Sequence, residues 1–97
     1  MFIETYAYKV AKSRIDQYLD IQRRTKEVYL RYGCLSYEVF RSDDDLCLEI
    51  NRFEGRKHYE NVTKSVDLDP RIKALWKELC SIVEKEKVAT KRYEKML

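Results

Sequence analysis

The residues best suited to chemistry in this chain are Glu49 and Asn51, which alternate along one predicted strand. A strand places residues i and i+2 on the same face, so this carboxyl and this amide are neighbours. Polar groups gathered on an inner face indicate a pocket, because an unpaired buried carboxylate is costly. Glu49 and Asn51 are therefore candidate catalytic residues, and Glu38 could join them across the hairpin. The alternative is that this face meets water or a second protomer and that the acids pair with Lys or Arg.

His58 is the only histidine and the third catalytic candidate, as a general base. A lone histidine on a short surface helix can equally be a solvated or hydrogen-bonded residue. Trp76 could line a substrate pocket, and the hydroxyls of Tyr18 and Tyr29 could bind a ligand between helix and sheet. Helical spacing also fits all three aromatic residues as core side chains, with polar tips on the tyrosines.

Composition limits the function classes. The 97 residues are enough for one domain, which we place over residues 1–97. The 20 basic and 17 acidic residues are interleaved, which argues against nucleic-acid binding. Three scattered cysteines and one histidine favour reduced thiols in the cytoplasm and no metal site. The first ten residues include Glu4 and Lys9 and predict a strand, not a targeting segment, and we expect no membrane association.

Periodicity predicts an α+β fold with the order β-α-β-β-α-α-β, the ferredoxin-like pattern with an added short helix and an antiparallel four-stranded sheet. Ser13 is the expected N-cap of the first helix and Gly33 its C-terminal cap. Asp69 and Pro70 predict the start of the last helix. The expected strands are Phe2–Val10, Leu35–Arg41, Leu46–Phe53 and about Lys87–Tyr93, and the short helix is Gly55–Ser65.

The predicted sheet has apolar residues on both faces. Helices cover one face, and the other would be an apolar patch of a size that soluble monomers rarely expose. Pairing two such sheets removes the patch, so we expect a homodimer. The alternative is a monomer whose tyrosines are half exposed on a wet sheet.

The stretch Gly33–Ser42, Gly-Cys-Leu-Ser-Tyr-Glu-Val-Phe-Arg-Ser, resembles the second strand of the antibiotic biosynthesis monooxygenase-like family. Leu48–Gly55 is similar to the third strand of that family as it enters the short helix. The resemblance implies a homodimeric α/β barrel. Active family members include quinone-forming monooxygenases without a cofactor and haem-degrading enzymes. Phe53 aligns with a family tryptophan, which implies a substrate-binding position.

The resemblance implies a cofactor-independent monooxygenase-like protein that acts on a small aromatic or polyketide-type molecule. Haem is not expected, because Val62 stands where the haem degraders have their histidine. One alternative is a non-catalytic small-ligand-binding or structural dimer. Another is a mutarotase-like sugar isomerase, since Leu75–Leu79 is similar to the tryptophan-bearing helix of that group. Gln22 stands where that group has a histidine. An enzyme requires a pocket between sheet and helices, lined by Tyr18, Trp76 and one or more of His58, Glu49 and Asn51.

Overall fold

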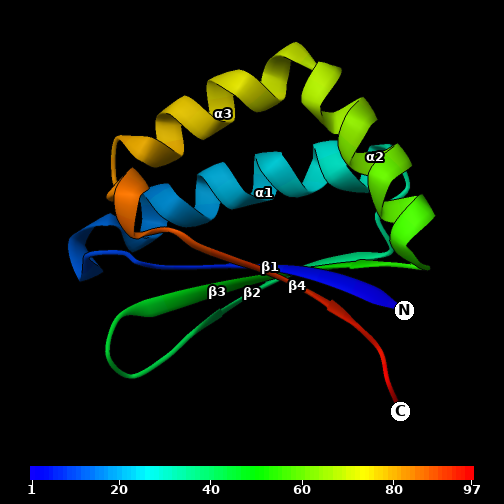
Figure 1. Ribbon diagram of the computed structural model, residues 1–97. Coiled ribbons are helices and arrows are strands. Elements are labelled where there is room, and N and C mark those ends of the chain that lie inside the picture. Colours follow the sequence, from blue (N-terminus) through cyan, green and yellow to red (C-terminus); the bar gives the residue numbers. More distant parts are fainter.

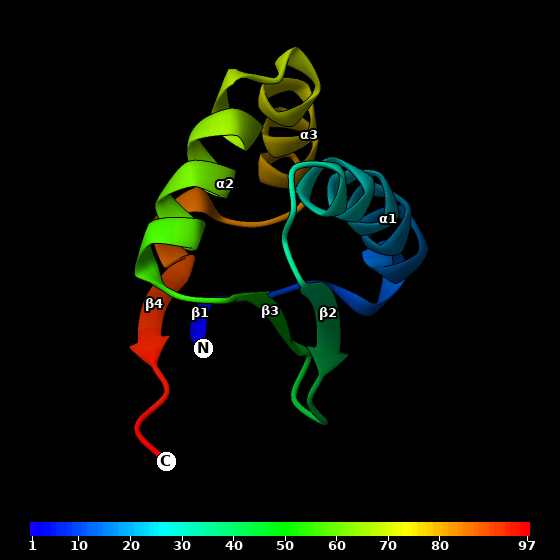
Figure 2. The ribbon, with the colours of Figure 1, turned by 90° about the vertical axis from the view of Figure 1, so that its right-hand side faces the viewer.

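Four antiparallel strands form one sheet in the order β2-β3-β1-β4, and the helices all lie on one of its faces (Figures 1 and 2). The computed structural model describes residues 1–97. Its topology confirms the predicted ferredoxin-like α+β fold. The strands are β1 (Phe2–Lys9), β2 (Ser36–Arg41), β3 (Leu46–Phe53) and β4 (Ala89–Glu94), and the helices are α1 (Ile15–Arg31), α2 (Arg56–Leu68) and α3 (Pro70–Cys80).

The two central strands, β1 and β3, place polar residues under the helices. Their register sets Glu4 opposite Asn51 and Tyr6 opposite Glu49. Residues of even number in β1 and odd number in β3 face the helices, because side chains alternate between the faces of a sheet. Glu4, Glu49 and Asn51 are consequently buried, together with the ring of Phe53.

Helix α1 ends where the sequence predicts but begins differently. Gly33 follows it with a φ of 105°, a left-handed conformation that glycine adopts without strain. The expected N-cap at Ser13 is wrong, because Lys12–Arg14 form a short 3-10 turn and the helix begins at Ile15 without a side-chain cap. Helix α1 turns Tyr18 and Gln22 toward the sheet, and both are buried.

Helices α2 and α3 meet at Asp69. Its side chain accepts a hydrogen bond of 2.9 Å from the backbone N–H of Arg71, and Pro70 occupies the first turn of α3, as predicted. Helix α2 runs three residues beyond the predicted Ser65. Strand β4 starts two residues late, since Lys85–Lys87 form another 3-10 turn.

The face of the sheet turned away from the helices is largely apolar. Phe40 of β2 lies opposite Leu48 of β3, and the alternation of side chains turns both to this face. Phe40 is half exposed, and Leu48 and Ile50 are only partly buried. No helix here combines the length and the apolar character that crossing a bilayer would demand.

Candidate functional site

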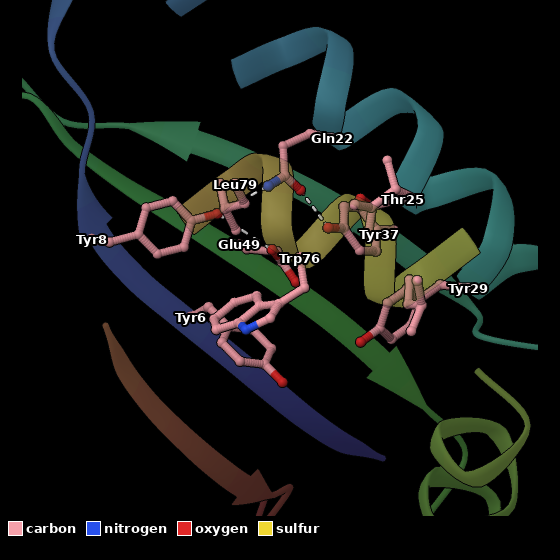
Figure 3. A pocket seen from close by; sticks show the side chains of 11 residues that line it. Tyr6, Tyr8, Gln22, Thr25, Tyr29, Tyr37, Glu49, Trp76 and Leu79 are labelled. Carbon is pink, nitrogen blue, oxygen red and sulfur yellow. Dashed lines mark hydrogen bonds between the residues drawn. The ribbon is translucent and has the colours of Figure 1, made fainter. Parts of the chain in front are cut away.

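A cavity lies between the sheet and helices α1 and α3, as the enzyme hypothesis requires. The space within it that can hold water-sized groups has a volume of about 80 Å³, and the volume is about 460 Å³ when the open mouth is included. Most of its wall is apolar or aromatic, and its polar groups, apart from the tyrosine hydroxyls, come from β3 and α1. The lining residues are Tyr6, Tyr8, Gln22, Thr25, Tyr29, Tyr37, Glu49, Ile72, Leu75, Trp76 and Leu79 (Figure 3).

Glu49 is the only carboxylic acid in the cavity wall. Its side chain is 5 % exposed, and burial raises its pKa from the ordinary 4.5 to about 7. Hydrogen bonds work against this rise, first that from Asn51 Nδ2 to Glu49 Oε2 at 2.9 Å. The nearby charge of Glu4 adds to it. A carboxyl that titrates near neutral pH can accept and return a proton under physiological conditions.

A chain of neutral donors ends at Glu49. Tyr37 donates to the Gln22 amide oxygen, and Gln22 Nε2 donates to the Tyr8 hydroxyl at 3.0 Å. Tyr8 then donates to Glu49 Oε1 at 3.4 Å, a long bond that leaves this oxygen weakly satisfied (Figure 3). Tyr18 lies behind Tyr8, with the two hydroxyls 3.0 Å apart. The chain fixes the Tyr8 hydroxyl and leaves Glu49 as its final acceptor.

Glu4 is a second buried carboxylate beside the cavity. Its carboxylate accepts hydrogen bonds from Tyr6 at 3.0 Å, from Tyr59 at 2.7 Å and from Arg92 Nε at 2.9 Å. Arg92 therefore neutralises the charge of this buried carboxylate. Glu49, by contrast, has no Lys, Arg or His within ion-pairing distance.

The structure brings together some of the candidate residues. Glu49, Tyr29 and Trp76 line the cavity. Asn51 and Tyr18 lie directly behind the wall, where Asn51 contacts Glu49 and Tyr18 contacts Tyr8. Trp76 is 40 % exposed, so it borders the open side of the cavity and is not the core residue that helical spacing favoured.

His58 and Phe53 lie outside the cavity wall. The imidazole Nδ1 of His58 accepts the backbone N–H of Glu54 at 3.0 Å, and its ring meets Phe53 edge-on with the centroids 6.0 Å apart. Phe53 is fully buried. Glu38 does not join Glu49, because its place in β2 turns it to the outer face, where it accepts a hydrogen bond from Arg52.

Sequence reasoning missed Tyr6, Tyr8, Tyr37 and Gln22 as cavity residues. The three tyrosines occupy inward strand positions, where an aromatic side chain is ordinarily core packing. Their signal was the concentration of hydroxyls on the face that also holds Glu49. A buried Gln22 on the inner stripe of α1 was the other signal, since a buried amide needs partners.

No cluster of three or more His, Cys, Asp or Glu side chains is arranged to hold a metal ion. The chemistry that the residues themselves support is proton transfer at Glu49, a buried carboxyl in the wall of an aromatic cavity. The aromatic wall and the single carboxyl suit a small, flat, largely apolar ligand.

Comparison with known proteins identifies the fold. No family model matches the sequence, and no curated protein matches it either. Solved structures do match over nearly the whole chain. A NIPSNAP domain protein from Burkholderia xenovorans has a TM-score of 0.78 at 12% identity, covering 99% of this chain and 95% of that one. An antibiotic biosynthesis monooxygenase has a TM-score of 0.77 at 13% identity, with both chains fully covered.

A third structure, a nipsnap family protein with unknown function from Agrobacterium tumefaciens, has a TM-score of 0.76 at 19% identity. It covers 98% of this chain and 87% of its own. At these identities the likeness concerns the backbone and does not carry over an activity. The chain thus has the fold shared by antibiotic biosynthesis monooxygenase and NIPSNAP domain proteins, the first of which the sequence resemblance had implied.

Proposed function

We propose that this protein is a cofactor-independent monooxygenase-like enzyme that uses Glu49 as a general base on a small aromatic substrate. The observation that carries the proposal is a buried carboxyl with a pKa of about 7 in the wall of an aromatic cavity. The fold shared with antibiotic biosynthesis monooxygenases supports the same reaction class.

The proposed reaction needs a substrate whose carbanion is stabilised by its own rings. Glu49 removes a proton from a ring CH₂ group, and the carbanion reduces O₂ and bonds to one of its oxygen atoms. The resulting hydroperoxide loses water and leaves a carbonyl group. The substrate CH₂ and O₂ thus become C=O and H₂O, with all the electrons supplied by the substrate. Tyr8, which donates to Glu49, holds the carboxylate in place and shares the proton.

The composition of the wall favours an aromatic ligand over a sugar. A sugar needs a hydrogen-bonding partner for most of its hydroxyls, whereas the hydroxyls of Tyr6, Tyr8 and Tyr37 already donate to other protein groups. The mutarotase-like alternative is therefore the weaker one. A non-catalytic ligand-binding dimer has the same cavity and differs only in turnover.

Anthrone, whose CH₂ group ionises readily, is a direct probe of the reaction. We expect the protein to accelerate O₂ uptake and the appearance of quinone absorbance, and Glu49→Gln to reduce the rate at least a hundredfold. Glu60→Gln, which alters an exposed carboxyl on α2, is the matched control and should keep the full rate. Equal rates with and without protein, or an active Glu49→Gln variant, would refute the proposal. Binding without turnover would support the non-catalytic alternative.

We further propose a homodimer in which the outer sheet faces of two copies meet. Phe40, Leu48 and Ile50 would then be covered, as the hydrophobic effect favours. Light scattering should give twice 11.8 kDa at micromolar concentration. Leu48→Glu should yield monomers, whereas Leu68→Glu, at an apolar residue of α2 that is 77 % exposed, should leave the dimer intact. A monomeric parent protein would contradict the proposal.

The three cysteines are unpaired within the chain, and Cys34 and Cys47 are buried. We therefore propose that the protein works in the reducing environment of the cytoplasm.

A further inference from the structure

The cavity contains a carboxyl whose negative charge, when it is ionised, no cation of the protein balances. Glu49 lines the cavity, and none of the eleven lining residues is Lys, Arg or His. The partners of Glu49 are the amide of Asn51 and the hydroxyl of Tyr8, which are neutral. The neighbouring carboxylate of Glu4 differs in this respect, since Arg92 pairs with it at 2.9 Å. Burying the Glu49 carboxylate away from water without a counter-ion is costly. A ligand that brings a positive charge offsets this cost and therefore binds more tightly.

The wall around this charge is unusually aromatic. Five rings line the cavity, and they come from β1, from β2 and from helices α1 and α3 (Figure 3). The face of an aromatic ring carries partial negative charge and attracts cations, most strongly when water is excluded. Aromatic rings together with one carboxylate form a common binding arrangement for organic ammonium groups. The five are Tyr6, Tyr8, Tyr29, Tyr37 and Trp76.

The same features disfavour other ligand classes. An anion would meet Glu49 with no basic residue to offset the repulsion. Arg92, which lies beside the neighbouring Glu4, is already engaged with Glu4 and Tyr59. A neutral aromatic ligand such as anthrone would fill the apolar part of the cavity but would bring no charge to pair with ionised Glu49.

We propose that the cavity binds a small organic cation, an ammonium group on an apolar or aromatic body, with its charge beside Glu49. This inference rests on the proposed function in using the same cavity, and it specifies the class of substrate. The apolar body would lie against Trp76 and Tyr29, toward the open side. The positive charge would also keep Glu49 ionised, which is the form that accepts a proton.

A pair of isosteric probes tests the charge alone. 3-(Trimethylammonio)phenol and 3-tert-butylphenol have the same shape and differ by a positive nitrogen in place of a carbon. Trp76 is the only tryptophan and borders the cavity, so its fluorescence reports binding, with calorimetry as a second measurement. We expect the ammonium compound to bind at least tenfold more tightly than the tert-butyl compound.

Glu49→Gln should abolish this preference, because glutamine keeps the shape of the side chain and removes its charge. Glu60→Gln should retain the preference, and circular dichroism checks that both variants are folded. Equal or tighter binding of 3-tert-butylphenol to the parent protein would overturn the proposal, as would binding of neither probe.

The two proposals can fail separately. Preferential ammonium binding without oxygenation of any probe would leave the cation site standing and refute the monooxygenase. Oxygenation of anthrone without a preference for the ammonium probe would support the monooxygenase and refute the cation site.

Discussion

Glu49 and Asn51 lie two residues apart on β3, and the Asn51 amide donates a 2.9 Å hydrogen bond to the Glu49 carboxyl under the helix layer. The other amide atom, Asn51 Oδ1, is buried without a partner. Asn51 can therefore hydrogen-bond to Glu49 in both protonation states. If the amide group flips, its oxygen accepts a hydrogen bond from the protonated carboxyl. A free acceptor beside a titrating acid makes this pair suited to proton exchange.

The raised pKa of Glu49 makes stability depend on pH. Between pH 4.5 and about 7 the folded protein holds a proton that the unfolded chain releases, so the free energy of unfolding falls as pH rises. At 1.36 kcal/mol per unit, the loss from this group approaches about 3 kcal/mol at pH 8. Asp69 has a lowered pKa, caused first by its hydrogen bond with Arg71, so its effect on stability changes only in more acidic solution.

Glu49→Gln should remove this dependence. Urea unfolding should show the variant close to the parent protein at pH 4.5 and more stable at pH 8, by up to about 3 kcal/mol. Parallel pH curves for the two proteins would contradict the pKa of Glu49.

Arg92 should stabilise the fold through Glu4. Arg92→Met leaves a carboxylate that is 2 % exposed with hydroxyl donors only. Because the Arg92 side chain is itself 54 % exposed, we expect a loss of about 1–2 kcal/mol and not the full penalty of a buried pair. Lys87→Met, which breaks an exposed pair with Glu84, should change stability by less than about 0.5 kcal/mol.

A double-mutant cycle with Glu4→Gln isolates the pair. The second substitution should recover part of the loss seen with Arg92→Met, because it removes the uncompensated charge. Strictly additive losses in urea unfolding would show that the two residues do not interact.

Gly33→Ala should be destabilising through the backbone. The φ of 105° lies in the left-handed region, while an added Cβ would meet His58 and Val62 at ordinary distances of 3.5 and 3.7 Å. We expect a loss of about 1–2 kcal/mol in thermal or urea unfolding. Gly55→Ala is the control, since that glycine is extended and a Cβ there would meet nothing within 4 Å. Equal losses for the two variants would refute the explanation.

Asp69→Ala should weaken the junction between α2 and α3. The substitution removes the cap of α3, the ion pair with Arg71 and the acceptor of the Tyr32 hydroxyl at 2.7 Å. A loss of about 1–2 kcal/mol in urea unfolding is expected, typical of an N-cap. Asp69→Asn keeps the capping oxygen and should lose clearly less. If both variants lost the same amount, the ion pair and not the cap would be responsible.

The fold was predictable because its signals are local. Alternation in Phe2–Val10 and Leu46–Phe53 assigns side chains to the two faces, and Gly33 and Asp69 mark helix ends with specific backbone requirements. The start of α1 was not predictable in the same way. Ser13 has the right chemistry for a cap, but a 3-10 turn precedes the helix and places Arg14 at that position.

The site was predictable only in part. Glu49 stood out because an acid on an inner strand face is costly, and Trp76 because it is a single large ring on a helix. The hydrogen bonds from Tyr37 through Gln22 to Tyr8 join β2, α1 and β1, which are distant in sequence. Such contacts follow from packing and leave no periodic trace in the chain.

Strand β3 separates two surfaces with opposite requirements by the alternation of single residues. Glu49 points into the cavity, while Leu48 and Ile50 on either side of it point to the outer face. A slip of one residue in this strand would exchange them, placing the leucine among the tyrosines and the carboxylate on the apolar face. An insertion or deletion in the 42–45 turn that shifted this register would therefore damage ligand binding and self-association together.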